Sequence, residues 1–203
     1  MIKNTEFAKN AATEFNFMAK ETQKIKDEKI IELKNQLKVA NIYQVPKLEK
    51  IVINSGVGRY VSTDERKDGK PLAIIEISKI LSLISGQKPK ITRAQKSIAS
   101  FKIRENDEIG ATVTLRGKRM QDFLFKLINV TLPRTRDFRG ISEKKVDVNG
   151  ILTIGIKEHL AFPELIDEDF KRIYGLEITL VPNTRNREKA LALYKSLNIP
   201  FSK

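Results

Sequence analysis

Hydrophobic and polar residues alternate in several segments of the chain, which is the pattern of a strand buried on one face. In residues 48–55 the core side would carry Ile51 and Ile53, and the outer side Lys50, Val52 and Asn54. Residues 109–116 repeat the pattern, with Ile109, Ala111, Val113 and Leu115 on one side and Gly110, Thr112, Thr114 and Arg116 on the other. Two more strands are predicted over residues 151–157 and 175–181.

Apolar residues at helical spacing predict four helices, over residues 22–40, from Pro71 to Gly86, from Gly117 to Pro133, and over residues 187–197. Gly86 is expected to end the second helix and Pro133 the third. The expected buried residues are Ile30, Leu33 and Leu37 with Ile31 beside them, then Ile74, Ile77, Leu81 and Ile84, then Met120, Phe123, Leu124, Leu127 and Ile128, and finally Ala190, Leu191, Tyr194 and Leu197.

Strands interspersed with helices predict an α+β fold. The expected architecture is a mainly antiparallel sheet with helices packed on one face and the other face open. Residues 1–21 are interpreted as an N-terminal extension, and residues 22–203 as a single domain that is long enough to bury a sizeable core.

Positive charge is concentrated in one quarter of the chain. The net charge is +13, and residues 88–139 hold thirteen Lys and Arg against five Asp and Glu. Such a concentration indicates a nucleic-acid binder. A basic membrane-surface protein is the alternative, but it should show a cationic amphipathic helix with bulky apolar residues opposite, whereas the most basic stretch here contains Pro and Ser.

That stretch, residues 85–104, is interpreted as a loop with few apolar residues for packing. It contains no carboxylate, and its six cations are Lys88, Lys90, Arg93, Lys96, Lys102 and Arg104. Close cation pairs repel by about 1 kcal/mol in water, so a bound polyanion would offset the repulsion. The alternative is a solvated lysine-rich surface.

The outer side of the predicted sheet offers small hydrogen-bonding side chains, Asn54, Thr112 and Thr114, together with Arg116. These groups suit the shallow minor groove of structured RNA, whereas unpaired strands are bound by exposed aromatic rings. An ordinary solvated sheet face is the alternative.

No motif for catalysis, metal binding or cofactor binding is present. The chain has no cysteine and one histidine, His159, for which a structural or surface role is expected. Gly56-Val57-Gly58 lacks the third glycine of a dinucleotide fingerprint, since Val61 stands there. Glu105, Asp107 and Glu108 are interpreted as a solvated acidic turn rather than a metal site. An RNA-modifying or RNA-cleaving enzyme and a stand-alone RNA chaperone remain as alternatives. No apolar run approaches membrane-spanning length, so a cytoplasmic protein without membrane contact is expected.

A series of short motifs occurs in one order from about Lys26 to the end of the chain. They are Gln44-Val45-Pro46, Ile53-Asn54-Ser55-Gly56-Val57-Gly58, Ser85-Gly86-Gln87-Lys88-Pro89, Ile91-Thr92, Ala94, Lys96-Ser97, Phe101-Lys102-Ile103-Arg104, Val113-Thr114-Leu115-Arg116-Gly117, Pro133-Arg134, Arg136-Asp137-Phe138-Arg139-Gly140, Phe162-Pro163-Glu164, Gly175-Leu176 and Pro200-Phe201. In these motifs the chain resembles the bacterial-type ribosomal protein L5 family, which binds 5S rRNA.

The resemblance implies a non-enzymatic component of the central protuberance of the large ribosomal subunit, cytoplasmic and ribosome-associated. The expected partners are 5S rRNA, the large-subunit rRNA, the peptidyl-site tRNA, the small-subunit head protein S13 and neighbouring central-protuberance proteins. Asn54, Gln87 and Thr114 match family residues that hydrogen-bond 5S rRNA, and the expected 5S rRNA site also includes Lys88, Lys90, Thr112 and Arg116.

Residues 92–104 match the family loop that reaches the tRNA elbow. Its expected contact residues are Thr92, Arg93, Lys96, Ser97, Phe101, Lys102 and Arg104, and Arg134, Arg136 and Arg139 are further candidates for rRNA contact. Two features depart from the family pattern: the extension 1–21, and a longer, more charged segment between Gly58 and Ile80.

Overall fold

The computed structural model of the chain describes residues 31, 33–37, 39, 41–61, 66–67, 70–136, 138–165, 168, 170 and 172–202. The chain divides into two compact units, Met1–Pro46 and Lys47–Lys203. The boundary expected between residues 21 and 22 lies outside the described residues, as does the extension 1–21. The sheet and every candidate site residue belong to the second unit.

In the first unit, the described residues include part of the first predicted helix and a short 3-10 helix. Residues 33–36 are helical and Leu33 is buried, whereas Ile31, expected beside the buried stripe, is 53% exposed. The 3-10 helix spans Ile42–Gln44, and the Asn41 side chain accepts a hydrogen bond from the Tyr43 N–H at 3.0 Å. The predicted start of the first helix near residue 22 lies outside the described residues.

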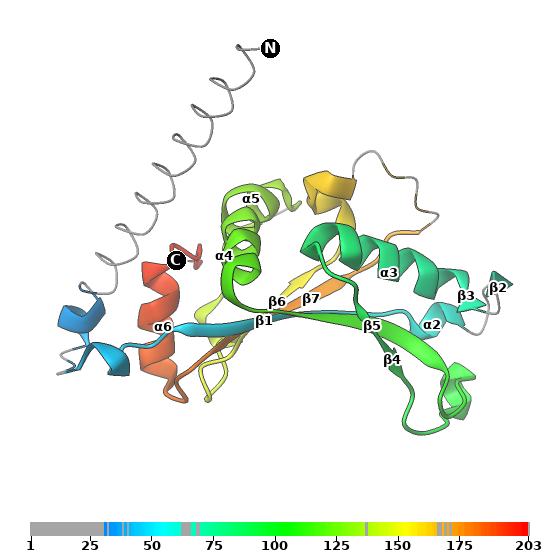
Figure 1. The fold of residues 1–203 in the computed structure, drawn as a ribbon, viewed down its shortest axis with the longest axis horizontal. Coiled ribbons are helices and arrows are strands. Elements are labelled where there is room, and N and C mark those ends of the chain that lie inside the picture. The colour runs from blue at the N-terminus through cyan, green and yellow to red at the C-terminus, as the bar shows by residue number, and fades with distance from the viewer. Residues whose placement is uncertain are drawn as a thin grey trace, which may run out of the picture. The chain divides into compact units, whose positions relative to one another are not determined.

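Five strands of the second unit form one antiparallel sheet in the order β4-β5-β1-β7-β6 (Figure 1). They span Leu48–Gly56 (β1), Lys90–Arg93 (β4), Glu108–Leu115 (β5), Leu152–Ile156 (β6) and Leu176–Pro182 (β7). A separate two-stranded pair is formed by Arg66–Lys67 (β2) and Lys70–Pro71 (β3). The predicted α+β fold is confirmed, and the four predicted strands agree with the structure to within one residue at each end.

The central strand β1 supplies the middle of the core. Ile51 lies opposite Leu115 of β5 and Leu180 of β7, while Ile53 lies opposite Val113 and Ile178. All six side chains are buried. Residues that are directly opposite in antiparallel strands point to the same face, so this face of the sheet is apolar across three strands.

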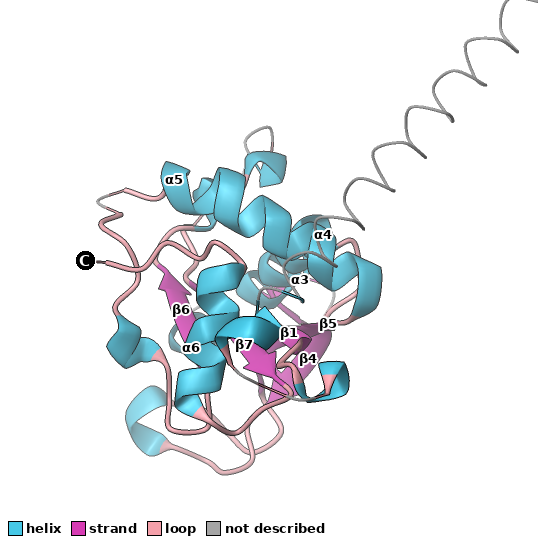
Figure 2. Ribbon diagram, turned by 90° about the vertical axis from the view of Figure 1, so that its left-hand side faces the viewer, coloured by secondary structure: helices cyan, strands magenta, loops and turns pink. Residues whose placement is uncertain are grey.

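Helices cover that apolar face. Figures 1 and 2 show α3 and α4 on the same side of the sheet. The helices span Gly58–Val61 (α2), Leu72–Ser85 (α3), Gly117–Lys126 (α4), Leu132–Arg134 (α5) and Arg187–Ser196 (α6), and 3-10 turns span Ala99–Phe101, Glu143–Lys145, His159–Ala161 and Pro163–Leu165. The predicted buried stripe of α3 is confirmed, and Gly86 ends this helix in the left-handed conformation with φ 63°. Within the described ranges no helix has the length and apolar content to cross a bilayer.

Pro133 does not end the third predicted helix where expected. After α4 the backbone widens into a π-helical segment, Leu127–Thr131, and continues into α5, so Pro133 lies inside the final turn. Proline has no N–H to donate to the carbonyl of Asn129, four residues earlier, and its ring clashes with that carbonyl. A π-helical turn accommodates this clash, because the Leu132 N–H donates to the Leu127 carbonyl five residues back.

The buried face of α6 also differs from the prediction. Ala190, Leu193 and Tyr194 are buried, whereas Leu191 and Leu197 are only partly covered. The Tyr194 hydroxyl lies 2.8 Å from the Gly150 carbonyl and 3.0 Å from the Leu180 carbonyl, which orients the helix. Burial raises the pKa of Tyr194.

Lys126 connects the end of α3, α4 and the turn at residues 163–165. Its ammonium group donates to the Ile84 carbonyl at 2.8 Å and pairs with Glu164, and it lies over the rings of Phe123 and Phe162 at 5.7 and 5.9 Å. The side chain is only 22% exposed. Because the Ile84 carbonyl lies in the last turn of α3, this lysine satisfies an acceptor that the helix itself leaves free.

Replacing Lys126 with methionine keeps most of the packing but leaves the Ile84 carbonyl and Glu164 without this donor. We expect the free energy of unfolding to fall by about 1–3 kcal/mol in urea titrations. The matched control is Lys79→Met, because Lys79 pairs with Glu168 at a more exposed position, with 54% of its side chain accessible. That variant should lose less than about 1 kcal/mol. Equal losses in the two variants would contradict the role given to Lys126.

His159 has a structural position, as expected. It is 1% exposed, and its Nδ1 accepts a hydrogen bond from the Tyr174 N–H at 3.0 Å. Burial lowers the pKa of His159 from its ordinary value of 6.5, against smaller raising effects of the Tyr174 hydrogen bond, Glu76 and Glu158. No group of three or more potential metal-ligating side chains occurs among the residues that the structure describes.

The lowered pKa of His159 predicts a pH-dependent stability. Below pH 6.5 the unfolded chain binds a proton that the folded chain does not, so the contribution is complete above pH 6.5 and is lost as the pH falls toward the folded pKa. Since His159 is the only histidine, His159→Asn, which keeps an acceptor for the Tyr174 N–H, should remove this component. Urea titrations from pH 7.5 to 5.5 should show a steeper fall in the parent, by up to about 1.4 kcal/mol per pH unit. Parallel curves for parent and variant would exclude the effect.

Candidate nucleic-acid interface

The sheet face opposite the helices carries a row of polar side chains. Asn54 of β1 lies opposite Thr112 of β5 and Glu177 of β7, and Thr112 lies opposite Lys90 of β4. Thr114 lies in the neighbouring row, opposite Val52. Asn54, Thr112, Thr114 and Lys90, predicted from alternation and from the family motifs, therefore share one face near the β4 edge.

Some polar side chains on this face are held by hydrogen bonds within the protein, and others have free hydrogen-bonding groups. The Thr112 hydroxyl donates to the Ile53 carbonyl at 3.1 Å, and the Gln87 side chain donates to the Thr114 carbonyl at 3.3 Å. Gln87, which follows α3, is thereby held beside β5. Thr114 is exposed and Asn54 is half-buried, and within the described part of the chain neither side chain has a hydrogen-bond partner. A half-buried amide with free donors and acceptors can bind an incoming polar ligand.

Two corrections apply to the basic stretch 85–104, which was expected to be a loop of unneutralised cations. Its residues Lys90–Arg93 form the edge strand β4, paired with β5. Arg93 forms an ion pair with Glu108 at 3.4 Å, so the carboxylate comes from outside the stretch. Arg116, expected at the 5S rRNA site, likewise pairs with Glu49 at 3.2 Å. Lys88, Lys90, Lys96, Lys102 and Arg104 have no ion pair among the described residues.

Residues 94–107, called the arm below, form a closed hairpin rather than an open loop. The backbone of Ala94 bonds with Asp107 and with Asn106, each at 2.9 Å, and Ile98 and Ile103 form an antiparallel bridge. The Asp107 carboxylate accepts from the Arg104 N–H at 2.7 Å. These bonds arise between residues up to thirteen positions apart, which is why the local composition did not predict them.

The residues expected to contact tRNA fall into two groups in the arm and β4. Thr92 and Arg93 lie in β4, where Arg93 is paired with Glu108, and the Ser97 hydroxyl accepts from the Glu105 N–H at 3.0 Å within the arm. The remaining four are exposed, and Phe101 presents half of its surface to solvent. The exposed group consists of Lys96, Phe101, Lys102 and Arg104.

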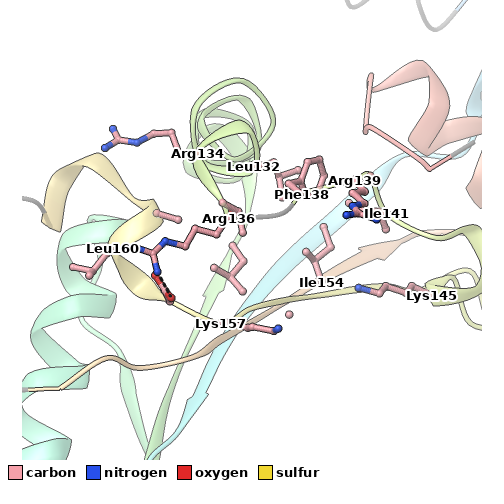
Figure 3. A pocket seen from close by; sticks show the side chains of 16 residues that line it. Leu132, Arg134, Arg136, Phe138, Arg139, Ile141, Lys145, Ile154, Lys157 and Leu160 are labelled. Carbon is pink, nitrogen blue, oxygen red and sulfur yellow. Dashed lines mark ion pairs between the residues drawn. The ribbon is translucent and has the colours of Figure 1, made fainter.

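A second basic feature lies at the other edge of the sheet, where a cavity of about 730 Å³ separates residues 132–141 from β6. We call it the basic groove, and Figure 3 shows the side chains around it. Its cations are Arg134, Arg136, Arg139, Lys145 and Lys157. The three arginines were candidates from the sequence, whereas Lys145 and Lys157 were missed because only the fold brings them to the same place.

Comparison with known proteins supports one family assignment. The model of the family described as Ribosomal protein L5 matches residues 41–104, and the model that describes the C-terminus of the same ribosomal family matches residues 108–201. Among curated relatives, a large ribosomal subunit protein uL5 of Halothermothrix orenii is 47% identical over 180 residues, which cover 89% of this chain and 97% of the relative.

Proteins of the same name give similar values in two other organisms. That of Oceanobacillus iheyensis is 49% identical over 181 residues, covering 89% of this chain and 97% of the relative. That of Mycoplasma pneumoniae is 51% identical over 174 residues, covering 85% and 92%. The resemblance found in the sequence motifs is therefore confirmed, and the chain belongs to the ribosomal protein L5 family.

Proposed function

We propose that the chain is a non-enzymatic constituent of the large ribosomal subunit that binds 5S rRNA through the open face of its sheet. The large ribosomal subunit is proposed as the assembly because the names of its relatives assign those proteins to it. The proposal that this face binds 5S rRNA rests on the row formed by Lys90, Thr112 and Asn54, with Thr114 and Gln87 beside it.

The chemistry of this face supports structured RNA as the ligand. Asn54 and Thr114 offer free hydrogen-bonding groups, and Lys88 and Lys90 add exposed positive charge at the β4 edge. Amide and hydroxyl groups can bond the ribose 2′-hydroxyls and base edges of a minor groove, while the lysines neutralise phosphates. Arg116 can contribute only in competition with its Glu49 ion pair.

The other expected partners follow from the family resemblance. The arm is proposed to contact the peptidyl-site tRNA, because its exposed residues combine cations with the aromatic ring of Phe101. Protein S13 and neighbouring central-protuberance proteins are proposed as further partners, with no residues assigned to them.

Binding of 5S rRNA should depend steeply on salt and on Thr114. If about six phosphates are engaged, the log–log slope of affinity against salt should be on the order of −4 to −5.

Thr114→Ala should weaken binding by about 1 kcal/mol in filter-binding assays without lowering the free energy of unfolding, since the hydroxyl is exposed. The matched control is Thr153→Ala in β6, a threonine on the same face at the far edge, which should have a smaller effect. A flat salt response would exclude this mode of binding, and unchanged affinity in Thr114→Ala would remove Thr114 from the site.

Charge reversal in the arm should separate tRNA contact from rRNA binding. Lys96→Glu with Lys102→Glu should spare 5S rRNA affinity but weaken peptidyl-site tRNA binding to reconstituted subunits by about 2 kcal/mol, since two attractive contacts are lost. The double variant Arg119→Glu with Lys189→Glu changes the net charge equally at exposed positions outside the proposed sites. Equal loss of 5S rRNA and tRNA binding in the arm variant would assign the arm to the rRNA site instead.

A further inference from the structure

Glu177 of β7 is an exposed carboxylate on the sheet face that is proposed to bind a polyanion. The five strands of the sheet contain three carboxylates, and two of them, Glu49 and Glu108, are paired with arginines. Glu177 has no ion pair among the residues that the structure describes. A phosphate placed over this side chain would be repelled, so an RNA that covers it must offer it a different group.

Glu177 extends the polar row of the open face beyond β1. Its neighbours in the row are Asn54 of β1 on one side and Gly155 of β6 on the other. Directly opposite residues of antiparallel strands have Cβ atoms about 5 Å apart, so the amide and the carboxylate can contact one group of a ligand. Lys90 lies three strands away in the same row, about 14 Å at the usual strand spacing. The row therefore changes from positive at the β4 edge to negative at β7.

Gly155 leaves the β6 side of Glu177 open. Its backbone is not in the left-handed conformation, and a Cβ atom added to it would meet no heavy atom within 4 Å beyond its chain neighbours. Neither the backbone nor the packing of the folded chain therefore requires glycine at this position, although glycine weakens a strand. A glycine inside a strand often marks a place where a ligand approaches closely. Its position beside Glu177 gives an RNA strand the room to do so.

We propose that Glu177 and Asn54 together recognise the minor-groove edge of a guanine in the bound RNA, with Gly155 giving the RNA backbone clearance. This inference rests on the proposed 5S rRNA site and deepens it by adding a specificity-determining residue. The Glu177 carboxylate accepts a hydrogen bond from the exocyclic amino group, and the Asn54 amide donates one to the neighbouring ring nitrogen N3. Phosphates of the same RNA then lie toward Lys90, at the positive end of the row.

The chemistry of a carboxylate selects the RNA group that it can bind. An ionised carboxylate only accepts hydrogen bonds, and the guanine amino group is the one base donor in a minor groove. Ribose 2′-hydroxyls are donors as well, but they occur at every nucleotide. A neutral side chain such as Thr114 can bond them without repelling the nearby phosphates. A charged acceptor is therefore better matched to a guanine than to a ribose.

Removal of the carboxylate tests whether Glu177 attracts or repels the RNA. Glu177→Ala should weaken binding of a 5S rRNA transcript about tenfold in filter-binding assays, because the guanine amino group loses a charged acceptor. Glu177→Gln keeps an acceptor oxygen and should lose less affinity. The control is Asp122→Ala, which removes an exposed carboxylate of α4 and should leave 5S rRNA affinity unchanged or slightly raised. Unchanged or tighter binding by Glu177→Ala would overturn the proposal, since a carboxylate that merely repels phosphates gives that result.

Analogue interference mapping identifies the RNA group directly. Transcripts of 5S rRNA that carry phosphorothioate-tagged inosine at random guanosine positions are separated into bound and unbound pools. Inosine lacks the exocyclic amino group, so the parent protein should select against it at the contacted guanosine. Glu177→Ala should abolish this selection, whereas Thr114→Ala should retain it. Identical inosine patterns for the parent and Glu177→Ala would overturn the proposal. Loss of selection in a parallel series of 2′-deoxynucleotides instead would assign the contact to a ribose and also overturn it.

Gly155→Thr tests the clearance beside Glu177. The variant fills open space with a residue that favours strands, so the free energy of unfolding in urea titrations should not fall. Its affinity for 5S rRNA should fall, because the new side chain occupies the path of the RNA. Unchanged affinity would overturn the role given to Gly155. A parent protein that binds no 5S rRNA would instead refute the proposed function of the sheet face, so the two failures are distinguishable.

Discussion

The register of β1 between β5 and β7 is the constraint on which both the core and the candidate RNA surface depend. Ile51 and Ile53 are fully buried, and burial of such a side chain contributes about 1.5–3 kcal/mol. A shift of one residue would turn both isoleucines to the open face and place Val52 and Asn54 under the helices. The energy that fixes the core thereby also fixes the row of Lys90, Thr112 and Asn54.

Ion pairs neutralise some of the cations around the sheet and leave others unpaired. Arg93 and Arg116 are paired with Glu108 and Glu49, whereas Lys88 and Lys90 lie exposed at the same edge. The Arg116–Glu49 pair is exposed on both sides and adds less than about 1 kcal/mol to stability, whereas the Glu108 side chain of the other pair is only 16% exposed. Among the described residues, cations without an ion pair occur at the β4 edge, on the arm and around the basic groove, and also outside these places, as at Arg119 and Lys189.

Sequence reasoning succeeded where the determining interactions are local or periodic. The alternation around Ile53 and Val113 identified both strands and their outer faces, because burial of one face imposes a period of two. It failed where distant residues decide the structure. Pairing with Glu108 and Asp107 turns the basic stretch into β4 and a hairpin, and the convergence of Lys145 and Lys157 depends on how the chain returns to the sheet edge. The binding roles of Asn54, Gln87 and Thr114 stay predictions, since the structure places these side chains without a ligand.

In the proposed complex, 5S rRNA lies on the open sheet face and its phosphates meet the exposed lysines at the β4 edge. A sheet suits this task, because paired strands keep Lys90, Thr112 and Asn54 at a fixed spacing that a flexible segment would not maintain. The net charge of +13 supplies counter-charge for such a polyanion. RNA that binds the folded chain would also stabilise it by mass action. The same strands that bury Ile51 and Ile53 therefore set the spacing of the groups offered to RNA.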